Sequence, residues 1–437
     1  MSLATPEKIR ALQRKLYVKA KAEPAFRFYL LYDKVYREDI LHHAYRLARS
    51  NGGAPGVDGV AFTDIEESGV EEWLSRLGEE LHGRTYKPDP VRRVLIPKPG
   101  GGQRPLGIPT VRDRVAQTAA KLVLEPIFEA DFEESAYGYR PGRSAQGAVR
   151  EVHRALCAGF TDVVDADLSK YFDTIPHPEL MRAFARRVSD PKMLKLIKAW
   201  LKVPVEERDE RGNRRMTGGK RSKQGTPQGG VISPLLANIY INRFLRAWRE
   251  RGKGGQYQAR IVNYADDFVI LSRGHAAEAL AWTRWAMRNL GLALNEDKTC
   301  VRDARQERFD FLGYTFGPER HRRDGHWYLA AQPSGKAVRR LKERVRSILR
   351  PGNKGAWPEV VGRLNRTLRG WANYYDQGTR YLAYRAVDNY VYHAVRNFRR
   401  RRHRIRNPGR VRRLSSEVIF GKLGVVRMRT LHLGPSP

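Results

Sequence analysis

Two groups of aspartates lie at positions where a carboxylate is costly unless a partner stabilises its charge. Asp266 and Asp267 lie between two apolar runs, 260–263 and 268–271, so we expect them at the tip of a hairpin, while Asp167 ends a β-branched strand. Adjacent carboxylates repel, and a carboxylate at the end of a buried strand needs a partner. Taken singly, the pair could be an acidic turn and Asp167 a helix cap. Taken together, they are the minimum for a site in which two Mg²⁺ ions bridge an attacking hydroxyl and a phosphate.

The remaining sequence predicts the elements that must position these side chains. Because strands and helices do not alternate regularly, the fold class is expected to be α+β. Helices are expected at 1–50, 68–83, 111–130, 178–187, 190–202, 233–249 and 276–290, and again from residue 336 on, with separate helices at 358–375 and 380–402. Strands are expected at 91–97, 161–168, on both sides of residues 264–267, around a hairpin at 210–213, and within 309–330, and residues 98–105 read as a basic Gly/Pro turn.

The charge of the chain predicts a polyanionic partner. Lys and Arg number 82 against 47 Asp and Glu, a net charge of +35 over 437 residues. The excess is concentrated in residues 318–437, which hold 29 Lys and Arg against 7 Asp and Glu. Such self-repulsion needs an anionic partner, and nucleic acid is the expected one. An anionic membrane is the alternative, but there is no lipidation motif and no apolar run near the roughly 20 residues of a membrane helix.

Cysteine usage and the start of the chain favour an intracellular protein. Only Cys157 and Cys300 are present, which excludes a disulfide framework and a four-Cys zinc site. We expect both thiols to be buried small apolar residues. The first residues lack the apolar stretch of a secretory signal. Phosphate-loop, HExxH and GxSxG patterns are also missing, which leaves the aspartates as the main chemical signal.

The motifs around the aspartates resemble the reverse transcriptases of group II introns. Tyr-Ala-Asp-Asp at 264–267 is similar to the hallmark of reverse transcriptases, and on its own it is a weak signal. The blocks that resemble the group II branch, in the same order, are 53–59 (GAPGVDG), 104–109 (RPLGIP), 138–144 (GYRPGRS), 164–177 (VDADLSKYFDTIPH), 225–238 (GTPQGGVISPLLAN), 311–314 (FLGY) and, in the tail, 369–375 (RGWANYY). The resemblance runs from about residue 35 to the C-terminus.

The resemblance implies a right-hand polymerase: fingers, a palm with an antiparallel sheet, and a helical thumb. The implied domains are an N-terminal helical extension at 1–50, fingers at 51–160, a palm at 161–330 interleaved with the fingers, and a basic helical thumb or maturase RNA-binding domain at 331–437. Many relatives continue into a Cys-rich zinc endonuclease, and the near absence of Cys here predicts no second-strand cleavage by this polypeptide.

The resemblance also implies roles for single residues. Asp167, Asp266 and Asp267 would bind two Mg²⁺ ions, with the carbonyl of Leu168 as an added ligand. Residues expected to contact the incoming dNTP are Lys98, Arg104, Phe172, Gln228 and Lys298. Among these, Phe172 would exclude a 2′-hydroxyl and Lys298 would donate a proton to pyrophosphate, although an ordinary core Phe and a surface Lys are the plain alternatives. Residues expected to grip the primer are Phe311, Leu312 and Gly313.

The tail is expected to bind RNA. Residues 399–413 hold nine Arg and no acidic residue, so that counterion release on RNA phosphates accounts for them better than a solvated extension does. The arginines assigned to RNA are Arg339, Arg340, Arg344, Arg399, Arg400, Arg401, Arg402, Arg404 and Arg406. Trp371, Tyr374 and Tyr375 are expected to be core residues rather than base-stacking platforms.

The implied function is RNA-directed DNA polymerisation together with binding of the intron RNA, assistance to its splicing, and retrohoming. The implied partners are group II intron RNA, an RNA template with a DNA primer, dNTP and target DNA, with no membrane, in a bacterial cytoplasmic ribonucleoprotein. Two alternatives stay open: a maturase that only assists splicing, and a domesticated relative in defence or repair that uses the same chemistry on a different RNA.

Overall fold

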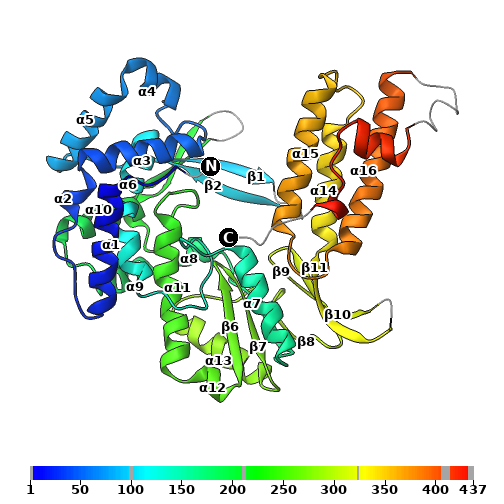
Figure 1. The fold of residues 1–437 in the computed structure, drawn as a ribbon. Helices are drawn as coiled ribbons and strands as arrows, with labels where there is room; N and C mark the ends of the chain where they lie inside the picture. The colour runs from blue at the N-terminus through cyan, green and yellow to red at the C-terminus, as the bar shows by residue number, and fades with distance from the viewer. Residues whose placement is uncertain (1–2, 98–101, 209–212, 322–323, 405–413, 432–437) are drawn as a thin grey trace.

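We analysed a computed structural model of the chain, which describes residues 3–97, 102–208, 213–321, 324–404 and 414–431. The fold is mixed α and β, as expected (Figure 1). The helices of the first half are α1 (Glu7–Ala22), α2 (Tyr32–Val35), α3 (Glu38–Asn51), α4 (Phe62–Ser68), α5 (Val70–His82), α6 (Val111–Glu129), α7 (Ala145–Cys157), α8 (Tyr171–Thr174), α9 (His177–Ala185) and α10 (Pro191–Leu201). The helices that follow are η1 (Gly219–Arg221), α11 (Ser233–Glu250), α12 (Lys253–Gln256), α13 (Ala276–Asn289), α14 (Gly335–Ile348), α15 (Trp357–Tyr374), α16 (Tyr381–Arg402), the π-helical turn η2 (Val418–Lys422) and η3 (Met428–Thr430). Most of the longer helices and the hairpins agree with the sequence prediction to within a few residues. The sequence prediction did not include α7, and the helical stretch expected at 1–50 is divided into α1, α2 and α3.

A four-stranded antiparallel sheet forms the centre of the molecule, as predicted for the palm. Its strands are β3 (Asp162–Asp167), β6 (Ala259–Tyr264), β7 (Asp267–Ser272) and β8 (Cys300–Asp303), in the order β6-β7-β3-β8. Alternate residues face opposite sides, because side chains in a strand repeat every two residues. Val163 and Val269 belong to a core shared with α7, while Val164 and Ile270 belong to the large core on the other face. The sheet is therefore covered on both sides and its strand ends are held firmly.

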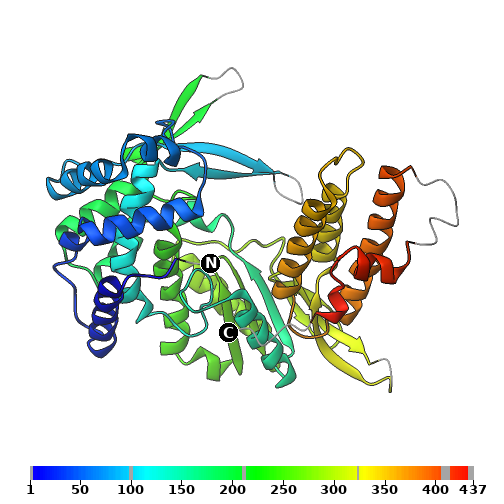
Figure 2. The same ribbon diagram turned by 45° about the horizontal axis from the view of Figure 1, so that its top comes forward.

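A second four-stranded sheet joins distant parts of the chain. It consists of β1 (Val91–Pro97), β2 (Gln103–Ile108), β4 (Pro204–Arg208) and β5 (Arg214–Gly218), in the order β2-β1-β4-β5. β1 and β4 run parallel, with Val91 opposite Val205. The predicted Gly/Pro turn at 98–105 was too long, because Gln103, Arg104 and Pro105 already pair with β1. The β1–β2 hairpin points toward α15 in both ribbon views (Figures 1 and 2).

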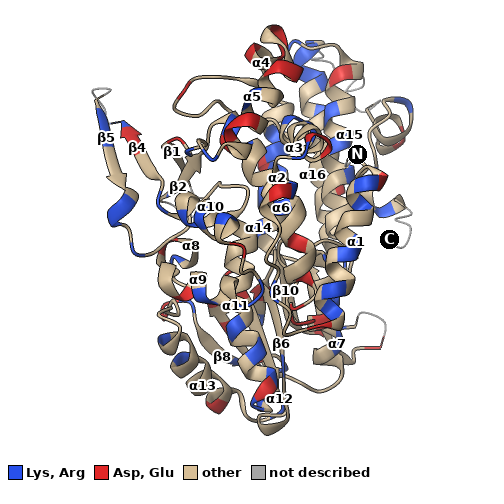
Figure 3. Cartoon of the chain, turned by 90° about the vertical axis from the view of Figure 1, so that its left-hand side faces the viewer, with Lys and Arg blue, Asp and Glu red and all other residues tan. Residues whose placement is uncertain are grey.

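The helices of the N-terminal half pack around α6. This helix is buried over most of its length and contacts α1, α2 and α3. It starts at an N-cap, Thr110, whose side chain accepts a hydrogen bond from the Asp113 backbone nitrogen. Lys and Arg line the outer surfaces of α1 and α10 (Figure 3). Positive charge is therefore also present on helices of the N-terminal half, in addition to the basic C-terminal residues 318–437.

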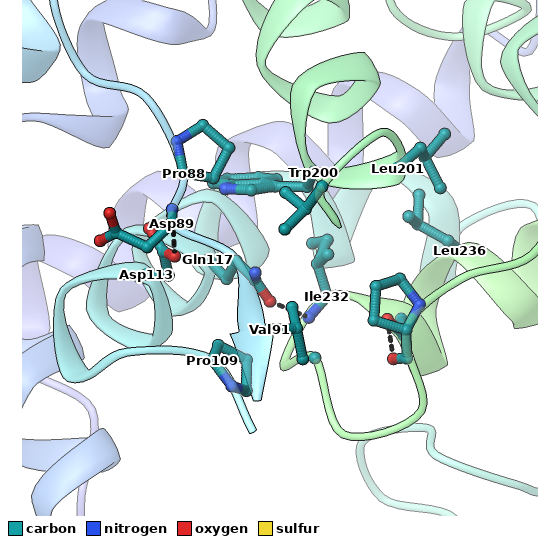
Figure 4. Close-up of a pocket in the computed structure, with 14 residues that line it drawn as sticks. Pro88, Asp89, Val91, Pro109, Asp113, Gln117, Trp200, Leu201, Ile232 and Leu236 are labelled. Atoms are coloured by element: carbon teal, nitrogen blue, oxygen red, sulfur yellow. Dashed lines mark hydrogen bonds between the residues drawn. The ribbon is translucent and has the colours of Figure 1, made fainter. Parts of the chain in front are cut away.

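A small cavity lies where α6, β1 and α11 meet (Figure 4). Its volume is about 10 Å³ and its lining includes Asp113, Gln117, Trp200 and Ile232. The Gln117 Oε1 atom accepts a hydrogen bond of 3.3 Å from the Ile232 backbone nitrogen. A space of this size holds no more than about one water molecule, so it is a packing defect and not a ligand site.

The C-terminal part is a helical bundle joined to the palm by a small sheet. That sheet has the order β11-β10-β9, formed by β9 (Phe309–Phe311), β10 (Tyr314–Arg320) and β11 (Trp327–Pro333). α14, α15 and α16 share a separate apolar core. The buried carboxylate of Asp388 on α16 accepts hydrogen bonds from the backbone nitrogens of Met428 and Arg429, at 2.8 and 3.3 Å. These bonds fasten the end of the described chain to the bundle.

Two further expectations are settled by the fold. The thiols are not buried: Cys157, at the end of α7, is exposed and Cys300 is half-buried. Cys157 ends an amphipathic helix on its solvent side, which the apolar character of Cys did not reveal. Within the described ranges, no helix combines the length and the hydropathy that crossing a membrane would require.

Candidate active site

The β6–β7 hairpin presents Asp266 and Asp267 at one end of the palm sheet. Its strands are joined by only two residues, Ala265 and Asp266, because Tyr264 pairs directly with Asp267. Two-residue connections need a residue with positive φ, and Ala265 has φ +61°. The side chain of Asn263, 1% exposed, donates a hydrogen bond of 2.9 Å to the Ala265 carbonyl and so stabilises this conformation. A non-glycine residue held in this region is typical of a functional turn.

β3 brings Asp167 beside this turn. Asp167 is the cross-strand partner of Asp267, and the Leu168 backbone nitrogen donates to the Asp266 carbonyl at 3.0 Å. The segment around Asn295 closes the other side, since its backbone nitrogen donates to the Asp167 carbonyl at 2.8 Å. The structure therefore brings Asp167 together with Asp266 and Asp267, which lie about 100 residues later in the sequence.

The carboxylates form a cluster of negative charge that Lys298 compensates only in part. Burial, with the charges of Asp165, Asp167 and Asp266, raises the pKa of Asp267 to about 8. Burial is also the main reason that the pKa of Asp266 is raised. The ammonium of Lys298 lies 2.6 Å from Asp167 Oδ2, and this hydrogen bond raises the pKa of the lysine. A cluster of hard oxygen donors that oppose one another in this way suits divalent cations such as Mg²⁺.

Asp165 is a member of this cluster that sequence reasoning missed. Burial raises its pKa to about 6, with Asp167 contributing in the same direction. Its position two residues before Asp167 puts both side chains on one face of β3, next to Asp267. The period of two along the strand was the signal that could have found it.

A strap, residues 135–139, packs against the β6–β7 turn at 264–267, and the sequence did not predict this contact. Asn263 donates its backbone hydrogen to the Ser135 carbonyl, and Tyr137 donates to the Asn263 carbonyl, both at 2.8 Å. Gly138 then passes so close to the turn that a Cβ atom there would lie 2.6 Å from the Ala265 nitrogen. The side chain of Asn238 fixes this crossing by donating to the Gly138 carbonyl at 2.8 Å. The motif 138–144 had been recognised, but without a role.

Tyr139 and Phe172 form an aromatic pair, and burial together with the charge of nearby Asp266 raises the pKa of Tyr139. Tyr139 is 47% exposed with φ +57°, and its ring centroid lies 6.3 Å from that of Phe172 and 6.4 Å from that of Tyr264. Phe172 is half-buried on α8, which follows β3 directly. Its carbonyl accepts a 2.7 Å hydrogen bond from the Thr226 nitrogen, so that α8 is fixed against the Gly-rich loop 225–230. The edge-to-face contact defines the direction of the Phe172 ring.

Gln228 and Arg104 lie on neighbouring segments at the same site. The Gly107 nitrogen of β2 donates to the Gln228 carbonyl at 2.5 Å. A Cβ at Gly229, where φ is +112°, would lie 2.2 Å from the Gly107 carbonyl oxygen, so that only glycine allows this approach. Arg104 is exposed on β2, and its positive charge opposes the rise in the pKa of Asp266 and of Tyr139. Lys98, the other predicted fingers contact, lies outside the described residues.

The residues predicted to grip the primer divide into an inner and an outer part. Phe311 is 1% exposed and packs in the core beneath the palm sheet. Its side chain therefore supports the Leu312–Gly313 turn from inside and cannot contact a primer directly. Leu312 has φ +50°, and its carbonyl accepts a 2.9 Å hydrogen bond from the Tyr374 hydroxyl. A Cβ at Gly313 would lie 2.5 Å from the Tyr375 hydroxyl. Tyr375 is 9% exposed and Trp371 packs on it at 4.4 Å, as expected for core residues.

The predicted RNA-binding arginines fall into two sets. Those with exposed side chains are Arg339, Arg340, Arg344, Arg400, Arg401, Arg402 and Arg404. Arg399 is half-buried over the Trp357 ring at 5.2 Å, and Arg402 also donates to the Gly355 carbonyl at 2.7 Å, so these two serve packing as well. Arg406 lies outside the described residues.

Comparison with known proteins identifies the family of this chain. Residues 96–316 match the family described as reverse transcriptase (RNA-dependent DNA polymerase), and residues 338–417 match the group II intron maturase-specific domain. Protein YkfC of Escherichia coli (strain K12) is 37% identical over 352 residues, which cover 72% of this chain and 90% of that protein. The group II intron-encoded protein LtrA of Lactococcus lactis subsp. cremoris is 30% identical over 387 residues, 74% of this chain and 61% of LtrA, so the chain spans less than two thirds of that relative. The structure of telomerase from Candida albicans with a fragment of telomeric RNA aligns with a TM-score of 0.43 at 14% identity, over 83% of this chain and 68% of that chain.

Proposed function

The chain belongs to the group II intron branch of the reverse transcriptase family, the RNA-directed DNA polymerases, and from this premise we propose that Asp167, Asp266 and Asp267 are its catalytic carboxylates. The observation that carries the proposal is their convergence: a cross-strand pair and a two-residue turn place three carboxylates at one sheet end. Together with the Leu168 carbonyl they would hold two Mg²⁺ ions. Bound there, the ions would stabilise the negative charge that develops on the transferred phosphoryl group.

The surrounding residues orient a dNTP. Arg104 projects from β2 on the side of Asp266, where a guanidinium can donate two hydrogen bonds to a triphosphate. Gln228 is held against β2 by the Gly107 hydrogen bond and faces Asp173, whose carboxylate accepts from its side chain at 3.4 Å. Phe172, braced by Tyr139, would meet a 2′-hydroxyl and so favour dNTP over rNTP.

Lys298 supplies the proton. Its ammonium lies beside Asp167, and their hydrogen bond raises the pKa of an amine that is protonated at neutral pH in any case. A protonated amine at this position can protonate the pyrophosphate leaving group, which makes it a general acid. The ion pair also offsets part of the charge of the carboxylate cluster.

The test is primer extension on an RNA template with a DNA primer, dNTPs and Mg²⁺. Asp266→Ala/Asp267→Ala should abolish cDNA synthesis. Asp162→Asn is the matched control, because Asp162 lies on the same strand at its opposite end, across from Ser272. Equal synthesis by the wild type and the double variant would contradict the assignment of the site.

The second function is binding of group II intron RNA and assistance to its splicing, with retrohoming into target DNA. It is supported by the maturase-specific match over 338–417 and by the exposed arginines of α14 and α16. We infer that the chain acts as a ribonucleoprotein. Charge reversal of Arg339, Arg340 and Arg344 should weaken binding of intron RNA and flatten its salt dependence while the carboxylate cluster stays intact. A protein that does not polymerise DNA but still binds intron RNA and assists its splicing would support the splicing-only alternative. A protein that polymerises DNA but does not bind intron RNA would support the domesticated alternative.

A further inference from the structure

Three potential metal ligands meet at the outer end of the β10–β11 hairpin. The Nδ1 atoms of His321 and His326 lie 2.7 and 2.6 Å from the same carboxylate oxygen, Oδ1 of Asp324. The two imidazole rings are stacked, with centroids 4.8 Å apart and an angle of 30° between their planes. All three ligand atoms lie within 4.8 Å of one another. Neither the sequence motifs nor the polymerase assignment accounts for this cluster.

The backbone and a neighbouring ring hold the two histidines in place. The His321 nitrogen donates to the His326 carbonyl at 2.8 Å, and the Gly325 nitrogen donates to the His321 carbonyl at 3.0 Å. The ring of Tyr328 contacts both imidazoles, with centroids at 6.3 and 5.9 Å. The Tyr328 hydroxyl lies 3.3 Å from the Thr379 hydroxyl, which ties the aromatic stack to the loop before α16. The ligands are thus largely preorganised, which lowers the cost of binding an ion.

We propose that His321, Asp324 and His326 form a binding site for one transition-metal ion of the Zn²⁺ class. Two imidazole nitrogens and one carboxylate oxygen select Zn²⁺, Ni²⁺, Cu²⁺ or Fe²⁺ over Mg²⁺, which prefers oxygen ligands. Three protein ligands on an exposed hairpin leave at least one position for water. Metal–ligand bonds of roughly 2.0–2.2 Å require only that the three atoms, now joined by hydrogen bonds, move apart slightly around the ion.

The alternative is a cluster held by hydrogen bonds alone. Hydrogen bonds from both histidines lower the pKa of Asp324 to about 2, so the carboxylate is ionised and available in either case. The charge of Arg320, whose Nε donates to the Gly325 carbonyl at 3.2 Å, opposes a dication and predicts moderate rather than very tight affinity.

The proposed site is separate from the polymerase centre. β10 has seven residues between the Leu312–Gly313 turn and the cluster, which at about 3.3 Å per residue is roughly 20 Å. A bound ion would cross-link the two strands of the hairpin at its tip. Its effect should therefore appear as local rigidity and metal content, and not as loss of the phosphoryl-transfer chemistry.

The experiment is equilibrium dialysis of the full chain against Zn²⁺ in a large excess of Mg²⁺, which fills oxygen-ligand sites. We expect one Zn²⁺ per chain in the wild type and loss of that ion in His321→Gln/His326→Gln. His275→Gln is the matched control. The His275 Nδ1 atom also lies near a carboxylate, 3.7 Å from Glu278, but among the described residues this pair does not belong to a group of three potential metal ligands. The control should keep the ion.

A second measurement guards against misfolding of the variant. Cu²⁺ bound at the site should quench the fluorescence of Trp327, which is 69% exposed and adjacent to His326. The difference in fluorescence between the wild type and Trp327→Phe isolates the signal of this tryptophan. Both histidine side chains are 42% or more exposed, so the double variant should keep the wild-type circular dichroism and melting temperature. Equal Zn²⁺ content in the folded double variant and the wild type would overturn the proposal, as would Cu²⁺ quenching of Trp327 that does not depend on the histidines.

Discussion

Replacing Gly138 with Ala should disable polymerisation while leaving the protein folded. A Cβ at this position would lie 2.6 Å from the Ala265 nitrogen and 3.1 Å from the Tyr264 carbonyl carbon. Ordinary contact begins at about 3.4 Å, so that the turn must move by about 0.8 Å. The strap cannot retreat easily, because Asn238 and the backbone of Asn263 hold it. The displacement therefore falls on the turn that carries Asp266.

The size of the effect follows from the geometry of catalysis. A misplacement of about 1 Å in a catalytic group can cost about 100-fold in rate. We expect the rate of single-nucleotide addition to fall by roughly this factor, with a smaller change in the binding of primer and template. The assay is pre-steady-state extension by one dNTP at saturating nucleotide.

Gly255→Ala is the matched control, since a Cβ there, on α12 of the palm, would meet nothing within 4 Å. Intron RNA binding and the melting temperature report whether Gly138→Ala is folded. A folded Gly138→Ala protein that adds nucleotides at the wild-type rate would refute the reasoning, because the turn would then tolerate the displacement or the strap would yield instead.

Four other outcomes are expected from contacts described above. Phe172→Ala should raise incorporation of rNTP relative to dNTP by roughly 10- to 100-fold, measured by competition on one template position, because the ring no longer meets the 2′-hydroxyl. Tyr139→Ala should give a smaller change in the same direction, since it removes only the edge contact that orients Phe172, and a change equal to that of Phe172→Ala would contradict this order. Burial raises the pKa of Asp113 to about 6. The contribution of Asp113 to the free energy of unfolding is therefore largest below pH 4 and falls by up to about 3 kcal/mol as pH rises to about 6. Urea unfolding of Asp113→Asn should lack this part of the pH dependence. Asp388→Ala should lower the melting temperature of the C-terminal bundle and expose residues 428–429 to proteolysis, whereas unchanged protection would show that the Asp388 hydrogen bonds are dispensable.

The aspartates could be predicted from the sequence because local patterns carry them. Apolar runs on both sides of Asp266 and Asp267 indicate a hairpin, and a β-branched run before Asp167 indicates a strand. The long helices could be predicted for the same reason, since their apolar stripes repeat at the helical period. Each of these features depends on neighbours within about 15 residues.

The missed features depend on contacts between distant segments. The role of Gly138 exists only because the catalytic turn, more than 120 residues later, passes against it. The burial of Phe311 depends on α7 and on the palm sheet, which share its core. Cys157 lies exposed at the end of α7, and no local rule indicates this exposure. Periodicity gives the face of an element but not the partner that covers it.

The parallel pairing of β1 with β4 also affects the order in which the protein can fold during synthesis. Val91 leaves the ribosome roughly 110 residues before its partner Val205, which at about 5–20 residues per second is a delay of roughly 5 to 20 s. During that interval Val91 and Arg92, the residues of β1 that pair with β4, have no partner on that edge. The outer half of the strand carries Val94, Leu95 and Ile96, which remain 37–53% exposed in the finished fold. An unpaired apolar edge recruits other strands. The nascent chain therefore passes through a period in which the β4-facing edge of β1 is open to pairing with other strands.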